Sequence, residues 1–161
     1  MLHQIENKIR ENQRITPEEG LFLYEKAELG FLGMMAELVK QRKSGNEVYY
    51  ILNFHIEPTN ICINKCNFCS YSHHFSPMQW DLPVEEMLQT VRQQEPEVKE
   101  VHITGAVHPD KDLFYYADLL RRIKQVRPDL HVKALSAVEL DYIAKKANLT
   151  YKKALQFLKE A

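Results

Sequence analysis

The sequence predicts an α/β fold built on a parallel sheet. Three segments have the branched and aromatic composition of buried strands: residues 48–56, 98–104 and 130–135. Two segments of helical periodicity, residues 84–94 and 113–126, alternate with them. Because strand and helix alternate, the strands should run parallel with right-handed crossovers. Parallel sheets bind ligands beyond the carboxyl ends of their strands, so we expect the functional loops there.

Helices are expected before the first strand. Thr16-Pro17-Glu18-Glu19 has the pattern of a capping box with proline at the first helical position, which predicts a helix from residue 17 to about residue 26. A second apolar helical pattern starts at Leu29 and should stop at Gly45. Both helices precede the residues that carry chemistry.

Two short helices should close the chain, one after Ser136 and one after Asn148-Leu149-Thr150. No internal repeat is visible. We therefore expect an N-terminal helical segment, residues 1–46, followed by an α/β domain, residues 47–161.

The amino-acid composition and net charge argue against some classes of function. The 161 residues are 45% hydrophobic and 27% charged, the balance of a domain able to bury a core. A net charge of -1 gives no electrostatic footprint for nucleic acid or an anionic membrane. Residues 1–12 are polar, and no later apolar run approaches a membrane span. We expect a cytoplasmic protein, whose reducing surroundings keep cysteines available as ligands.

All three cysteines, Cys62, Cys66 and Cys69, follow the first predicted strand with the spacing C-x-x-x-C-x-x-C. Three thiolates on one loop can hold three irons of a [4Fe-4S] cluster, whose usual set is four cysteines, and leave one iron open to a substrate. His73 leaves open an alternative, a structural Cys3His zinc site. An odd number of closely spaced cysteines argues against a disulfide framework.

Five further residues are candidates for cofactor binding. Phe68, between the last two cysteines, could stack near an adenine, and it should in any case act as a hydrophobic plug. Gly105, followed by Ala106, could bind an amino group through its backbone, or be a turn glycine. Ser136 and Glu139 have the spacing of a capping box, but Glu139 could instead bond a ribose hydroxyl or a substrate.

The histidines divide into two groups. His55 and His108 fall at the carboxyl ends of predicted strands, where a proton donor or carboxylate-binding group could work. His102 and His131 alternate with buried positions and are expected to pack in the core. The candidates for catalysis are therefore His55 and Glu139.

Three phrases resemble one family when taken with the cysteine loop: HIEPTN at residues 55–60, EVHITGAVHPD at 100–110 and HVKALSAVE at 131–139. The chain resembles the aminodeoxyfutalosine synthases, radical S-adenosylmethionine (SAM) transferases of the futalosine route to menaquinone. The resemblance implies the N-terminal part of a TIM-type (β/α) barrel, with the cluster on Cys62, Cys66 and Cys69 and with SAM on the fourth iron. It also implies a one-electron donor, such as flavodoxin or ferredoxin.

The resemblance further implies that a 5'-deoxyadenosyl radical adds to 3-[(1-carboxyvinyl)oxy]benzoate. Two alternatives stay open. Dehypoxanthine futalosine cyclase shares the cysteine loop and the strand-glycine-histidine-proline element, and a non-catalytic Cys3His zinc module belongs to another class.

Three features depart from the family. Relatives usually have Gly-Gly where this chain has Gly105-Ala106, and often an arginine at the position of His73. Their chains also continue past the position of Ala161 with the remaining strands. Three strands do not close a barrel of eight, so we expect an incomplete barrel that is inactive alone, with the remaining strands supplied in the same chain or by a second one.

Overall fold

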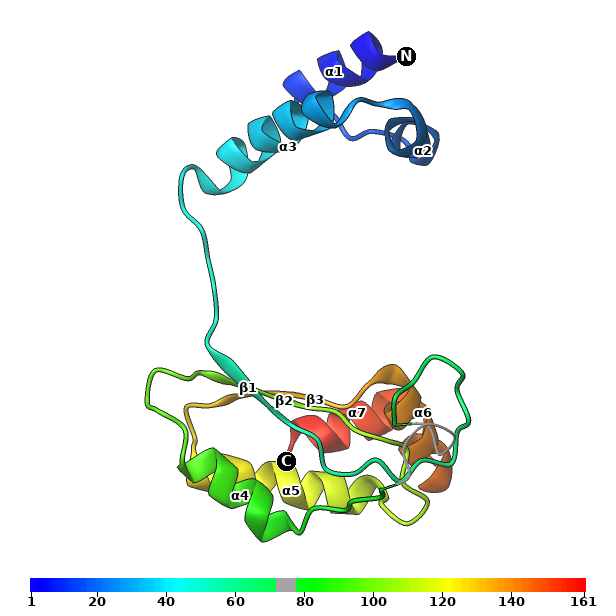
Figure 1. Ribbon diagram of the computed structural model, residues 1–161. Helices are drawn as coiled ribbons and strands as arrows, with labels where there is room; N and C mark the ends of the chain where they lie inside the picture. Colours follow the sequence, from blue (N-terminus) through cyan, green and yellow to red (C-terminus); the bar gives the residue numbers. More distant parts are fainter. Residues whose placement is uncertain (72–77) are drawn as a thin grey trace. The chain divides into compact units, whose positions relative to one another are not determined.

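The computed structural model describes residues 1–71 and 78–161 and divides into two compact units, Met1–Tyr50 and Ile51–Ala161 (Figure 1). His73, the fourth ligand of the zinc alternative, lies outside the described ranges. Within those ranges, every helix is too short or too polar to cross a membrane. The predicted division between residues 46 and 47 stays a prediction.

The N-terminal unit contains three helices: α1 (Leu2–Arg10), α2 (Pro17–Lys26) and α3 (Leu29–Ser44). The predicted capping box begins α2: the Glu19 amide donates to Thr16 Oγ1 at 3.2 Å, and the Thr16 amide donates to the Glu19 carboxylate at 2.8 Å. At the end of α3, Gly45 has a φ of 56°, a conformation that glycine adopts without steric cost.

The sequence analysis missed helix α1. Its composition is polar, but Ile5 is fully buried. Arg42 of α3 donates hydrogen bonds to the carbonyls of Ile9 and Arg10 in the last turn of α1, where carbonyls lack the partner that the helix interior supplies. A contact from a distant residue thus completes the end of this helix.

The second unit alternates strands and helices: β1 (Asn53–Ile56), α4 (Val84–Arg92), β2 (Glu100–Ile103), α5 (Leu113–Val126), β3 (His131–Ala134), α6 (Ala137–Lys146) and α7 (Tyr151–Lys159). The strand order is β1-β2-β3, and both pairings are parallel, which confirms the predicted topology. The carboxyl ends of the strands are in register, with Ile56 opposite Ile103 and Ile103 opposite Ala134.

The first strand is shorter than predicted. Only Asn53–Ile56 is a strand, whereas residues 48–52 are exposed, with Val48 at 81% exposure. Sheet pairing starts at Leu52, whose carbonyl accepts the Lys99 amide at 3.0 Å. The prediction of a buried strand over residues 48–56 was wrong. A composition of apolar and branched residues indicates strand propensity, but it does not show whether other elements of the fold will cover the segment.

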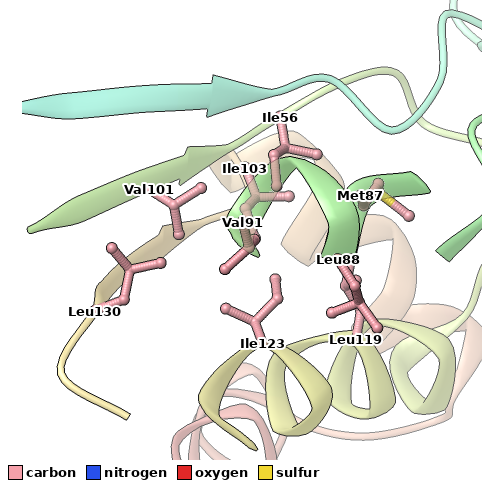
Figure 2. Close-up of a cluster of buried hydrophobic side chains, with 9 residues drawn as sticks. All are labelled: Ile56, Met87, Leu88, Val91, Val101, Ile103, Leu119, Ile123 and Leu130. Atoms are coloured by element: carbon pink, nitrogen blue, oxygen red, sulfur yellow. The ribbon is translucent and has the colours of Figure 1, made fainter. Parts of the chain in front are cut away.

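Helices α4 and α5 cover one face of the sheet (Figure 1). Figure 2 shows Val101 and Ile103 of β2 pointing toward Ile123 and Leu119 of α5, and these four side chains are at most 1% exposed. A second buried cluster joins α5 to α6 and α7: Leu113, Tyr116, Ile143, Ala144 and Ala154. The helices thus leave the carboxyl ends of the strands to the loops.

His102 and His131 do not pack in this core, which corrects the sequence prediction. They alternate with the core residues Val101 and Val132 along their strands, so they lie on the opposite face of the sheet. The His131 side chain is 70% exposed, and that of His102 is 22% exposed. The alternation along each strand places these histidines on the face away from the helices.

Candidate functional site

The cysteine loop, of which the structure describes residues 61–71, is held at its base by two buried polar residues, Thr59 and Asn60. The Asn60 side chain accepts the Trp80 amide and donates to the Met78 carbonyl, both at 2.8 Å. The Thr59 hydroxyl donates to the Trp80 carbonyl at 2.8 Å and accepts the Ile61 amide at 3.1 Å. These bonds join the residues before the loop to those after it, so its two ends are fixed together at the end of β1.

The turn after β2 lies directly against this base. The Ala106 amide donates to the Thr59 carbonyl at 3.0 Å, and the Ile63 amide donates to the Val107 carbonyl at 3.0 Å. A Cβ on Gly105 would lie 2.9 Å from the Thr59 carbonyl oxygen, closer than a side chain tolerates. Gly105 has no positive φ, so the close approach of the Thr59 backbone, and not a left-handed conformation, explains a glycine in this turn; binding of an amino group by its backbone stays a prediction.

Glu139 connects the end of β2 to the start of α6. The predicted capping box is present: the Ser136 amide donates to the Glu139 carboxylate at 2.6 Å, and the Glu139 amide donates to Ser136 Oγ at 3.3 Å. The same carboxylate accepts the Thr104 hydroxyl and the Gly105 amide, both at 3.1 Å. Glu139 is 2% exposed, so its carboxylate serves contacts within the chain; a bond to ribose or substrate stays a prediction.

An ion pair between the buried Lys111 and the exposed Asp81 joins the far end of the cysteine loop to the β2–α5 connection. Lys111, 8% exposed, places Nζ 2.9 Å from Asp81 Oδ1 and 4.1 Å from the ring centroid of Tyr115. Burial lowers the pKa of Lys111, but the hydrogen bond to Asp81 and the contact with Tyr115 outweigh it and raise this pKa. His108 Nδ1 accepts the Asp110 amide at 3.0 Å, which leaves Nε2 facing Asp81 Oδ2 at 3.9 Å.

We expect Lys111→Met to loosen the base of the cysteine loop without unfolding the sheet. Asp81 is 40% exposed and becomes hydrated when its partner is lost, so the local cost should be about 1 kcal/mol. Amide hydrogen exchange should accelerate about fivefold at Asn60 and Leu82, and should stay unchanged at Val101 in β2. The matched control is Lys99→Met, which removes an exposed pair with Asp129. Equal acceleration in both variants would contradict the proposed local role.

The three cysteines are free thiols; Cys62 is half-buried, and Cys66 and Cys69 are exposed. The Asn64 amide lies 3.4 Å from Cys62 Sγ, as a donor to sulfur. Across residues 1–71 and 78–161, no three His, Cys, Asp or Glu side chains converge as a metal-binding group. The donor set itself, three accessible thiols on one anchored loop, fits three irons of a four-iron cluster with one position open.

Phe68 is not a hydrophobic plug. Its side chain is 102% exposed, so the prediction that it is buried against the chain was wrong. The loop on which it lies is held by backbone and polar bonds at its base, and these leave the tip uncovered. Stacking near an adenine stays a prediction.

The two candidates for catalysis, His55 and Glu139, lie in different surroundings. His55 is exposed on the sheet face away from the helices, and its ring centroid lies 4.9 Å from that of His102. Glu139 is buried beneath the turn that follows β2. Sequence reasoning missed Asn60, Asp81 and Lys111, because charged and amide residues in loops are usually solvated. The only local signal was the position of Asn60 between a strand and a cysteine.

Comparison with known proteins supplies the family. A family model described as "Radical SAM superfamily" matches residues 56–161. The aminodeoxyfutalosine synthase of Thermus thermophilus is 36% identical over 98% of this chain and 43% of its own length. The 5-amino-6-(D-ribitylamino)uracil--L-tyrosine 4-hydroxyphenyl transferase of Methanothermobacter thermautotrophicus is 34% identical over 93% and 42%. The cyclic dehypoxanthine futalosine synthase of Streptomyces coelicolor is 30% identical over 89% and 37%.

Solved structures agree on the fold. The crystal structure of methylornithine synthase (PylB) matches with a TM-score of 0.63 at 19% identity, covering 96% of this chain and 55% of that one. HydG, a maturase of the [FeFe]-hydrogenase, matches with a TM-score of 0.69 at 21% identity, covering 91% and 34%. The chain spans less than half the length of the curated relatives it matches. Its sheet is part of a parallel (β/α) barrel, and the chain belongs to the radical SAM superfamily.

Proposed function

We propose that Cys62, Cys66 and Cys69 hold a [4Fe-4S] cluster and that SAM binds at the iron they leave open. The observation that carries this proposal is the anchored loop: all three thiols lie between the fixed ends of one segment, at the carboxyl end of a parallel sheet. When bound, the cluster supplies the electron that cleaves SAM to methionine and a 5'-deoxyadenosyl radical.

The chain's own residues position this site. Asn60 and Thr59 hold the loop ends together, and the Lys111–Asp81 pair binds the far end to the loop after β2. Gly105 allows that loop to lie against the base, and Glu139 fixes it from the side of α6. These contacts involve three connections of the sheet, β1–α4, β2–α5 and β3–α6, so the thiols are presented from a base that several elements hold.

We further propose that the reaction is that of an aminodeoxyfutalosine synthase, with 3-[(1-carboxyvinyl)oxy]benzoate as the acceptor of the radical. Among the relatives described above, the synthase combines the highest identity with the highest coverage of this chain. Cyclic dehypoxanthine futalosine synthase, at 30% identity, is the second candidate. A flavodoxin or ferredoxin is the proposed source of the electron.

Electron paramagnetic resonance tests the open iron. After anaerobic reconstitution, the signal of the reduced cluster should shift when SAM is added, because its amino and carboxylate groups chelate the iron. 5'-Methylthioadenosine, which lacks both groups, is the matched control and should leave the signal unchanged. An unchanged signal with SAM would contradict an open iron. Zinc instead of iron in the protein, with loss of that zinc in His73→Ala, would favour the Cys3His module.

The same spectrum distinguishes the substrates. With SAM bound, we expect 3-[(1-carboxyvinyl)oxy]benzoate to perturb the signal, since a substrate must lie beside the SAM that it reacts with. Dehypoxanthine futalosine and L-tyrosine, taken from the names of the other two relatives, serve as comparisons. If dehypoxanthine futalosine alone perturbs the signal, the result would contradict the synthase proposal and favour the cyclase.

A further inference from the structure

The sheet face away from α4 and α5 carries polar side chains in two rows. The strand register places Asn53 beside Glu100 and Glu100 beside His131, and one step further it places His55 beside His102 and His102 beside Lys133. Side chains in register on parallel strands point to the same face, and the alternate residues of these strands form the apolar core. We call these six residues the polar face.

A polar face of this kind is unusual for a barrel. In a (β/α) barrel the helices form the outer ring, and the inward side chains normally pack as layers of branched apolar residues. Here the helices lie on the apolar face, so the polar face is the one directed to the barrel interior. Buried polar groups require hydrogen-bond partners, so this interior suits a polar ligand and not a dry core.

The one acidic residue of the polar face is already paired. Glu100 Oε1 lies 2.5 Å from His102 Nε2, and Glu100 Oε2 lies 3.5 Å from His131 Nε2. The hydrogen bond with His102 lowers the pKa of Glu100 despite its partial burial. Glu100 thus orients the His102 ring, and its two carboxylate oxygens face histidines of both rows.

The second row contains hydrogen-bond donors and no carboxylate. His55 and Lys133, both exposed, flank His102, and adjacent strands lie about 4.8 Å apart. The His55 imidazole donates an N–H in its neutral and its protonated form, and lysine offers three donors with a positive charge, whereas His102 Nε2 is already bonded to Glu100. Charge-assisted hydrogen bonds to a carboxylate are the strongest that such donors make.

We propose that the row His55–His102–Lys133 binds a carboxylate of the substrate inside the barrel. A carboxylate above His102 is within reach of donors from both neighbouring strands. Its assignment to the benzoate group of 3-[(1-carboxyvinyl)oxy]benzoate rests on the proposed function, whereas the anion site rests only on the polar face.

The probe for this site is sodium benzoate, with sodium chloride at equal ionic strength and uncharged benzamide as controls. Nuclear magnetic resonance should show benzoate shifting the ring signals of His55 and His102, and not that of His3 in α1. Benzamide should shift none of the three. Equal shifts by benzoate and benzamide, or no benzoate shift at His55 and His102, would overturn the proposal.

Lysine substitutions test which positive charge binds benzoate. Lys133→Met should weaken benzoate binding about threefold to fivefold, the range for an exposed ion pair. Lys152→Met, on the exposed face of α7, is the matched control and should leave the affinity unchanged. Equal weakening in the two variants would show that the benzoate affinity depends on the net charge of the protein. That result would contradict a specific anion site on the polar face.

The outcomes separate this inference from the proposed function. If benzoate binding depends on Lys133 but SAM does not shift the cluster signal, the anion site stands and the proposed function fails. If SAM shifts the signal but benzoate binding is independent of Lys133, the anion site fails and the proposed function stands.

Discussion

Replacing Cys62, Cys66 or Cys69 by alanine should abolish assembly of the [4Fe-4S] cluster. Each variant leaves two thiolates for a cuboidal cluster that normally takes four ligands, so the cluster should be labile. Iron and labile sulfide per chain, measured after anaerobic reconstitution, should fall to background in all three variants. Helical content by circular dichroism should stay unchanged, because the thiols are outside both buried clusters.

Asn67→Ala provides the matched control for the cysteine variants. Asn67 is an exposed residue of the same loop, between Cys66 and Cys69, and offers no thiolate. It should assemble a cluster to the same extent as the unaltered chain. A full cluster spectrum in any one cysteine variant would exclude the three-cysteine assignment.

Glu139→Ala should be the most destabilising polar substitution in the α/β unit. The buried carboxylate accepts hydrogen bonds from Ser136, Thr104 and Gly105, and its removal leaves these donors without their acceptor. Hydrogen bonds to charged groups contribute roughly 1.5–3 kcal/mol each and are not additive, so we expect a loss of about 3 kcal/mol or more in the free energy of unfolding. Urea denaturation followed by circular dichroism measures this loss.

Glu139→Gln separates the charge from the shape of the side chain. The amide keeps one acceptor oxygen, so the loss should be about half that of the alanine variant. Glu160→Ala removes an exposed glutamate at the end of α7 and should change the stability little. If Glu139→Ala costs no more than Glu160→Ala, the contacts that join β2 to α6 do not stabilise the fold.

Local signals predicted most of the helices and the topology. The apolar periodicity of α5 predicted residues 113–126, and the structure has Leu113–Val126. The capping boxes at Thr16 and Ser136 begin α2 and α6 as expected, because a cap involves residues only three positions apart. The parallel order β1-β2-β3 followed from the alternation of strands and helices.

Burial was less predictable, because it depends on what covers a segment. Residues 48–52 have the composition of a strand, yet they are exposed ahead of β1. Phe68 is apolar and fully exposed, whereas Ile5 is buried in a helix of polar composition. An apolar side chain gains free energy only where another layer removes it from water, and that layer comes from distant sequence.

The sequence by itself determined that three thiols share one loop at the end of a strand, since their spacing alone requires it. Only the tertiary structure showed that Asn60 and Trp80 fix the ends of this loop and that Lys111 pairs with Asp81. It also decided that His131 faces away from the core. The physical reason is that periodicity and capping act within a few residues, whereas polar pairing and the choice of buried face depend on which strands and loops meet in space.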